Sequence, residues 1–233
     1  MSTGIGKVLE LILVEGRRHV RIACPPGLIP LPGQYLLAGD GSDAPLPVPL
    51  FHTDSAPQGV ATAPWQHFTA AAPVPDSWHP GLELHLRGPL GRGFGLPSSA
   101  RRVGLIAFDD SPARLKGLIQ PSLKQDAAVV LVCDSMPEDL PDDVEVQPLS
   151  ALPEIVDWAD YLACDVKREN LSRLRERLGK LNQLAAGNAA QILIRTPVPC
   201  GGVADCGVCA VNLRSDWKLA CKDGPVFNWN EVG

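Results

Sequence analysis

The pattern of apolar residues changes near residue 100 and divides the chain in two. Before that point, short β-rich runs cover residues 7–14, 19–23, 34–38 and 82–86. Turn signals at Glu15-Gly16 and Pro32-Gly33 separate some of these runs. Prolines are dense over residues 45–80, where they confine strands to edges and stiffen loops. Several short strands with turns between them predict a small β-barrel over residues 1–100.

The second part, residues 101–194, alternates strand-like and helix-like segments. Strand candidates, the first two of them continuous apolar runs typical of buried parallel strands, cover residues 103–108, 127–133, 161–164 and 191–195. Ser111 and Pro112 predict the start of a helix, which Pro121 is expected to bend or end. A second helix is predicted over residues 165–186, with a leucine stripe and a solvated face of Arg and Lys. This pattern predicts an α/β domain with a parallel sheet.

The remaining segment, residues 195–233, holds the most specific chemistry. It contains four of the seven cysteines, Cys200, Cys206, Cys209 and Cys221. Interleaved glycines permit the positive-φ turns that a loop of thiolates requires. Three clustered cysteines and a remote fourth are the plant-type arrangement for a [2Fe–2S] cluster, although the first gap here is one residue longer. The sequence therefore predicts a C-terminal [2Fe–2S] segment whose backbone N–H groups point at the sulfurs.

Three other interpretations of these cysteines stay open. A structural zinc site would use four thiolates, but such sites usually present two separate C-x(2–4)-C pairs, and this chain has one. Two disulfides would need an oxidising compartment. Four unrelated buried thiols would leave the interleaved glycines unexplained. The other cysteines, Cys24, Cys133 and Cys164, lie in or beside apolar runs and are predicted to be buried thiols.

Composition argues against several classes of protein. The 233 residues, 45% of them hydrophobic, suffice for one large or two modest domains. A formal net charge of −5 provides no basic surface for nucleic acid. No apolar run reaches the ~18 residues of a membrane-spanning helix, and residues 1–6 lack the pattern of a secretory signal. We therefore expect a cytoplasmic protein with no nucleic-acid or membrane partner.

Four stretches carry a resemblance to a known family. They are PGQY at residues 32–35, GPLGRGF at 88–94, the cysteine loop at 200–209 with Cys221, and CKDGPVF at 221–227. Their order and spacing resemble the electron-transfer subunit of class 1B dihydroorotate dehydrogenase, of the ferredoxin–NADP reductase superfamily. The resemblance implies bound FAD and a [2Fe–2S] cluster. It also implies electron transfer between NADH and the FMN of a partner catalytic subunit, within a hetero-oligomer.

The chain departs from this family at the flavin strand. The family has an Arg-Pro-x-Ser strand whose Arg and Ser assist FAD binding, whereas residues 48–52 here read Val-Pro-Leu-Phe-His. Residues 22–86 contain no Arg or Lys that could replace the lost phosphate partner. Leu50 and Phe51 are interpreted as barrel core. FAD binding stays open, because the GPLGRGF turn is intact and Arg87 or Arg92 could compensate.

A second departure concerns the nicotinamide cofactor. The family has a glycine-rich turn where backbone approaches the pyrophosphate at a helix N-terminus. Here that turn reads Asp109-Asp110-Ser111-Pro112, and two carboxylates repel a pyrophosphate. We interpret both aspartates as solvated helix-start residues and expect no NAD binding.

A third departure precedes the cluster, where Arg195 and Val198 stand at positions that are commonly Glu and Met in the family. The added charge of Arg195 is expected to shift the potential of the cluster. No Ser/His/Asp grouping or paired-carboxylate motif occurs, so no catalytic residue is predicted.

Two functional hypotheses follow. In the first, the chain is an electron-transfer subunit that relays electrons between its cluster and the flavin of a dihydroorotate dehydrogenase-like partner, without an NADH site of its own. In the second, it is a non-catalytic interaction subunit whose C-terminal loop is only stabilised by zinc or iron.

Overall fold

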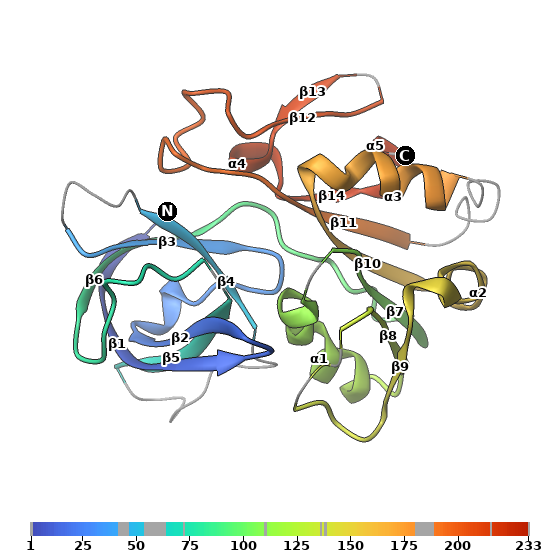
Figure 1. Ribbon diagram of the computed structural model, residues 1–233, viewed down its shortest axis with the longest axis horizontal. Coiled ribbons are helices and arrows are strands. Elements are labelled where there is room, and N and C mark those ends of the chain that lie inside the picture. Colours follow the sequence, from blue (N-terminus) through green and yellow to red (C-terminus); the bar gives the residue numbers. More distant parts are fainter. Residues whose placement is uncertain are drawn as a thin grey trace.

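The computed structural model describes residues 2–41, 47–53, 64–71, 73–109, 111–135, 137, 139–179, 189–214 and 216–232. A closed barrel and an α/β sheet lie side by side, and the C-terminal segment lies across one end of both (Figure 1). The boundaries proposed from the sequence, 1–100, 101–194 and 195–233, stay a prediction.

The barrel predicted from the β-rich runs is confirmed. Its strands are β1 (Ser2–Val14), β2 (Arg17–Cys24), β3 (Tyr35–Gly39), β4 (Val48–His52), β5 (Gln66–Ala71) and β6 (Glu83–Leu90). They close in the order β1-β2-β5-β4-β3-β6, with antiparallel neighbours throughout. Glu15 and Gly16 form the two-residue turn between β1 and β2, both with positive φ (51° and 72°), as a type I′ hairpin requires.

Two barrel strands lie in the proline-rich region and were not predicted from the apolar pattern. Among the residues that the structure describes, β4 pairs with β5 at Phe51 and His52 and not at Pro49, so the missing N–H of Pro49 interrupts no described bond of that ladder. A short 3₁₀ turn, Pro26–Leu28, lies between β2 and β3.

The α/β part is built on a six-stranded sheet in the order β14-β11-β10-β7-β8-β9. Its strands are β7 (Arg102–Ala107), β8 (Ala128–Val132), β9 (Val144–Gln147), β10 (Tyr161–Lys167), β11 (Ala189–Arg195) and β14 (Val226–Asn228). All neighbouring strands are parallel except β14, which pairs antiparallel with β11. The predicted parallel α/β sheet is confirmed, and its outermost strand comes from the C-terminal segment.

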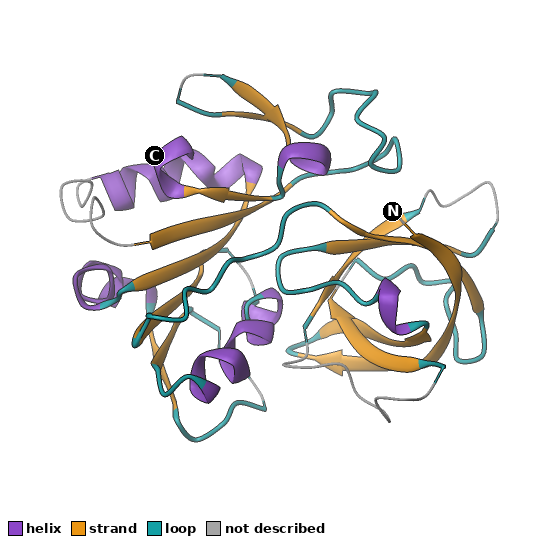
Figure 2. Cartoon of the chain, turned by 180° about the vertical axis from the view of Figure 1, so that it is seen from behind, coloured by secondary structure: helices purple, strands orange, loops and turns teal. Residues whose placement is uncertain are grey.

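Helices cover both faces of this sheet (Figure 2). One face packs against α1 (Ile119–Lys124) and the preceding 3₁₀ turns, Pro112–Arg114 and Lys116–Leu118. The other packs against α2 (Leu152–Trp158), α3 (Leu171–Gly179) and α5 (Trp229–Val232). Two more 3₁₀ turns, Leu149–Ala151 and Arg168–Asn170, lead into α2 and α3. Buried apolar residues of the cysteine segment, among them Val211, Ala220 and Phe227, pack into this second core.

The predicted helix boundaries were partly wrong. Ser111 caps its turn as predicted, accepting a hydrogen bond from the N–H of Ala113 at 3.3 Å. Pro121, however, lies in the first turn of α1 rather than at its end, where its missing N–H would have no helical partner anyway. The helix expected from residue 165 begins instead at Leu171, because β10 continues to Lys167 in register with β11. The rest of that predicted helix, residues 180–186, lies outside the described residues.

Candidate metal centre

The cysteine segment leaves the sheet after β11 and returns to it through β14. Between them lie a loop, the hairpin β12 (Ala210–Asn212) and β13 (Trp217–Leu219), and the short helix α4 (Ala220–Asp223). In the hairpin Ala210 pairs with Leu219, and the N–H of Ala220 donates to the carbonyl of Cys209 at 3.0 Å. This register brings Cys209 beside Cys221, although eleven residues separate them in the sequence.

The structure brings the four predicted ligands together as two pairs of thiols. Cys200 lies beside Cys206, and Cys221 lies beside Cys209 and is close enough to Cys200 to be influenced by its charge. The first pair faces outward, with Cys200 half-buried and Cys206 exposed, and the second pair is buried. In the part of the chain that the structure describes, no three His, Cys, Asp or Glu side chains are grouped so that they could hold a single metal ion. All seven cysteines are free thiols, which does not support the disulfide interpretation.

The two pairs lie in different electrostatic environments. Backbone N–H groups of Asp205, Cys206 and Val203, together with the thiol of Cys206, lower the pKa of Cys200 to about 6. Burial and the contact with Cys209 raise the pKa of Cys221 to about 12. The loop therefore directs amide donors at the sulfur of Cys200, as the sequence predicted.

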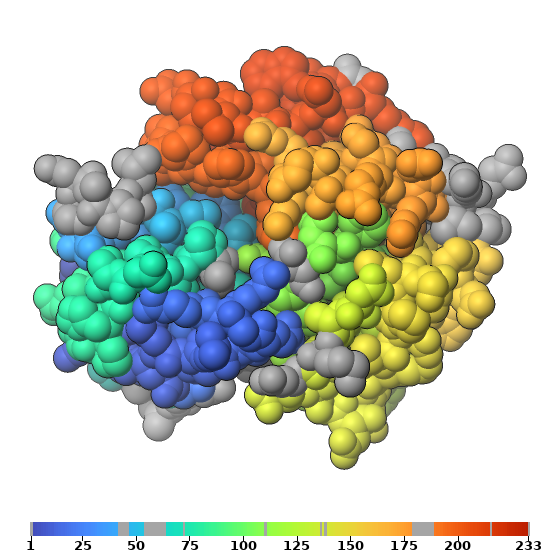
Figure 3. Space-filling view, in the orientation of Figure 1, coloured from blue at the N-terminus to red at the C-terminus, as the bar shows by residue number. Residues whose placement is uncertain are grey.

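The barrel and the α/β part both hold the cysteine segment in place. Tyr35 of β3 donates from its buried hydroxyl to the carbonyl of Cys221 at 3.0 Å. On the other side, Arg168 donates to the carbonyls of Val208 and Ala210, and Arg175 donates to the carbonyl of Asn212 at 2.7 Å. Figure 3 shows this segment, in orange-red, against both parts. The interpretation of these arginines as a solvated face was therefore wrong.

Gly202 is a position where the loop requires glycine. Its φ is +71°, and a β-carbon there would lie 2.9 Å from the hydroxyl oxygen of Tyr35. Any other residue would combine backbone strain with a clash against the hydroxyl that binds Cys221.

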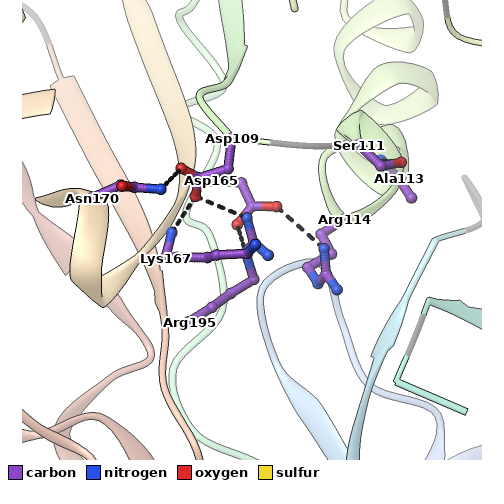
Figure 4. A network of polar contacts seen from close by, with 8 residues as sticks. All are labelled: Asp109, Ser111, Ala113, Arg114, Asp165, Lys167, Asn170 and Arg195. Carbon is purple, nitrogen blue, oxygen red and sulfur yellow. Dashed lines mark hydrogen bonds and ion pairs between the residues drawn. The ribbon is translucent and has the colours of Figure 1, made fainter. Parts of the chain in front are cut away.

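The position of the expected nucleotide turn is occupied by a network of buried charges (Figure 4). Asp109 follows β7, and its side chain is only 3% exposed. Its carboxylate accepts hydrogen bonds from the side chain of Asn170 at 2.5 Å, from the backbone N–H of Lys167, and from Arg195 at 3.0 Å. The interpretation of Asp109 as a solvated residue was wrong, and Asp110 lies outside the described residues.

A second carboxylate, that of Asp165, completes the network. Arg195 donates from Nε to Asp165 at 2.6 Å, and Arg114 lies 3.6 Å from the other oxygen of Asp165. We call these four residues, Asp109, Arg114, Asp165 and Arg195, the crevice network. Arg195 lies between two carboxylates, so its charge is neutralised locally. This weakens the expectation that Arg195 shifts the potential of a cluster.

The side chain of Phe51 closes the crevice between the barrel and the sheet. Leu50 belongs to the barrel core as predicted, but Phe51, next in the strand, points to the opposite face, and its interpretation as barrel core was wrong. Its ring centroid is 6.0 Å from that of Tyr35, and the guanidinium carbon of Arg114 lies 5.6 Å from it. The cavity left between Phe51 and Cys221 measures about 10 Å³, far too small for a flavin ring.

The remaining thiols behave as predicted. Cys24, Cys133 and Cys164 are all buried, and burial raises the pKa of Cys24 and of Cys164 to about 12.

Residues 200–233 match the family model of the iron-sulfur cluster binding domain of dihydroorotate dehydrogenase B. The chain is also similar to the electron transfer subunit of dihydroorotate dehydrogenase B (NAD(+)) from Desulforamulus reducens, with 25% identity over 257 residues and 97% of each chain covered. These matches confirm the resemblance predicted from the four motifs.

Solved structures confirm the fold. The structure of NADH-dependent reduced ferredoxin-NADP oxidoreductase superposes with a TM-score of 0.73 at 15% identity, covering 100% of this chain and 91% of the other. The ferredoxin reductase of carbazole 1,9a-dioxygenase gives a TM-score of 0.57 at 15% identity, covering 77% and 64%. In the part of the chain that the structure describes, no helix is long and apolar enough to cross a membrane.

Proposed function

We propose that the chain is the electron-transfer subunit of a dihydroorotate dehydrogenase-like enzyme and holds a [2Fe–2S] cluster through Cys200, Cys206, Cys209 and Cys221. The arrangement of these four thiols in two pairs within one loop is the observation that carries the proposal. A two-iron cluster takes four thiolates, shared between its two metals. A structural zinc ion instead needs all four around one centre, and the described residues form no such group. This favours the cluster over a zinc-stabilised loop.

The residues around the thiols fit the requirements of such a cluster. When bound, a [2Fe–2S] cluster supplies transfer of single electrons at a potential set by hydrogen bonds and solvent exposure. The amides of Val203, Asp205 and Cys206 stabilise negative charge on the sulfur of Cys200. Tyr35 fixes the backbone at Cys221 and so sets the position of the inner pair.

The outer pair marks the side from which a partner would approach. Cys206 is exposed, and the nearby apolar side chains of Val203 and Val208 are exposed as well. Exposed apolar groups around a redox site are typical of protein interaction surfaces. We propose that a flavin-containing catalytic subunit binds here and forms a hetero-oligomer with this chain. The cytoplasmic location stays a prediction.

We further propose that the chain has no NADH site of its own. In sheets of this kind the nucleotide pyrophosphate binds beyond the carboxyl ends of the strands, at a helix N-terminus. Asp109 and Asp165 lie at that end of β7 and β10, and their charges are already paired with Arg195. A pyrophosphate would have to displace a buried ion pair and then face two carboxylates.

The crevice fits FAD no better than it fits NADH. The strand residue that the family uses for flavin is Phe51 here, and its ring lies against Tyr35 and Arg114, which supports a crevice closed to a flavin ring. We therefore propose that the chain relays electrons without FAD in this crevice.

The test is analysis of protein that is made and purified without oxygen. We expect about two irons and about two acid-labile sulfides per chain, with visible absorbance that is bleached on reduction. Cys209→Ser should abolish the absorbance. Cys133→Ser, a change at a buried thiol outside the loop, should preserve it. Stoichiometric zinc without visible absorbance would refute the proposal.

A further inference from the structure

A cavity of about 410 Å³ lies beside the cysteine loop, on the outer face of the barrel. Its walls come from β1, β3 and β6, and from Gly201 of the loop. Ile5 and Leu37 contribute apolar surface, and Thr3, His85 and Arg87 contribute polar groups. This volume falls within the range of about 300–1,000 Å³ that is typical of small-molecule sites.

Arg87 is the unusual residue of this cavity. It is half-buried, and its Nε has no hydrogen-bond partner among the residues that the structure describes. The Nε atoms of Arg21, Arg114 and Arg175 also lack a partner, but those side chains are engaged through another nitrogen, with Glu10, Asp165 and the carbonyl of Asn212 respectively. A buried donor without an acceptor is rare in native structures and points to a group that binds there.

The strand register places the polar groups of the cavity on one surface. Thr3 is the cross-strand partner of Arg87, and Ile5 is the partner of His85. Because alternate residues of a strand point to the same face, Thr3 and Ile5 lie on the same side as His85 and Arg87. The guanidinium also reaches the cysteine loop, since a β-carbon on Gly201 would lie 4.0 Å from its Nη1.

These groups define the chemistry of a ligand. A guanidinium recognises carboxylate and phosphate groups through paired N–H donors. The hydroxyl of Thr3 and the imidazole of His85 can add further hydrogen bonds to the same anion. Ile5 and Leu37 offer an apolar wall to the rest of the molecule.

We propose that this cavity binds a small organic anion, with its carboxylate or phosphate on Arg87 and its apolar body against Ile5 and Leu37. The site is separate from the crevice between the barrel and the sheet, and it does not depend on the proposed electron transfer. Since Gly201 adjoins Cys200, the bound anion would add negative charge next to the metal loop.

Calorimetric titration of the full chain at low salt tests the proposal. The probes are benzoate, phenyl phosphate and the uncharged benzamide. We expect one anion per chain to bind saturably, at least about tenfold more tightly than benzamide, and the stronger of the two anions identifies the headgroup.

Two variants remove the anion site in different ways. Arg87→Gln removes the cation. Thr3→Glu retains Arg87 but places a carboxylate beside it, at its partner position on the neighbouring strand. Each should weaken binding of the anion at least about tenfold. Arg92→Gln, a loss of the same charge outside the cavity, should leave binding unchanged. If Arg87→Gln does not fold, Thr3→Glu decides the question alone, because Thr3 is exposed.

Three results would overturn the proposal. They are no binding of either anion at about 10 mM, equal binding of benzoate, phenyl phosphate and benzamide, or binding that both variants leave intact. A wild-type chain that binds no probe, combined with a cluster potential that shifts in Arg87→Gln, would show that the arginine serves the cluster alone.

Discussion

Replacing Arg195 by Met should destabilise the fold more than any other single charge removal in the sheet. The Arg195 side chain is 13% exposed and donates to Asp165 at 2.6 Å and to Asp109 at 3.0 Å. Those two carboxylates are only 1% and 3% exposed, so neither could be hydrated after the substitution. Removing one partner of a buried ion pair typically costs about 3–5 kcal/mol, because the other charge stays buried and uncompensated.

We expect the free energy of unfolding to fall by an amount within that range, and not by twice that amount for the two carboxylates. Asp109 would keep the N–H of Lys167 and the amide of Asn170, and Asp165 would keep Arg114 at 3.6 Å. For a chain of this size each kcal/mol lowers the melting temperature by about 2–4 °C, so the expected decrease is about 6–20 °C. Urea unfolding, followed by tryptophan fluorescence, would measure the free-energy change directly.

The control is Arg102→Met. Arg102 and Asp160 are 2.6 Å apart, the same separation as Arg195 and Asp165, but their side chains are 50% and 33% exposed. Solvent-exposed ion pairs contribute little to stability, so this variant should have almost the same free energy of unfolding as the wild type. Asp109→Asn, added to Arg195→Met, should recover part of the loss by removing one unpaired charge. A loss below about 1 kcal/mol for Arg195→Met, or equal losses for the two arginines, would refute the reasoning about burial.

Three further predictions concern the loop and the crevice. Gly202→Ala should reduce the iron content per chain far more than Gly207→Ala, because both have φ near +70° but only Gly202 faces a neighbour, the hydroxyl of Tyr35. Equal iron contents would mean that backbone strain alone matters. Calorimetric titration should detect no binding of NADH below about 1 mM, which corresponds to about −4 kcal/mol, whereas tight binding would show that the crevice opens. Denatured protein should release no fluorescent flavin. The double variant Val48→Arg with Phe51→Ser should not restore flavin binding, because Arg114 still fills the crevice. Release of near one FAD per chain would contradict this prediction.

The sequence predicted the architecture because periodicity and turn residues are local signals. Each of these signals predicts the structure of the segment in which it occurs. Examples are the alternation in β6, the apolar runs of β7 and β8, and the glycines among the cysteines. β4 and β5 were not predicted because prolines lie in or around them, and proline usually argues against strands. Asp165 was assigned to the start of a predicted helix and not to a strand, because a carboxylate is rarely found in a buried strand unless it is paired.

The partners of the buried charges could not be predicted from local pattern. Asp109 stands two residues before a capping serine, a region where solvated carboxylates are common. Its burial depends on Arg195, which reaches it only because β7, β10 and β11 are adjacent in the sheet. The pairing of the thiols likewise depends on contacts between segments that are distant in the sequence. The spacing of the cysteines predicts that they come together, whereas the hairpin of β12 and β13 determines that Cys209 meets Cys221.

The retained sequence motifs need not indicate retained FAD, because the structure gives them another role. A β-carbon on Gly33 of the PGQY stretch would lie 2.7 Å from Val226 and 2.9 Å from Phe94. One on Gly91 of the GPLGRGF turn would lie 2.5 Å from Pro225. Three motifs thus meet at one joint between the barrel, the sheet and the C-terminal segment.

This joint also positions the metal loop. The N–H of Arg92 donates to the carbonyl of Gly224, three residues after Cys221, whose own carbonyl is held by Tyr35. Larger residues at Gly33 or Gly91 would separate the surfaces and move Cys221 away from Cys209. The geometry of the four thiols therefore depends on the PGQY and GPLGRGF stretches whether or not a flavin is bound. A chain that lost its flavin strand and its nucleotide turn would still have to keep both stretches in order to keep its cysteine loop.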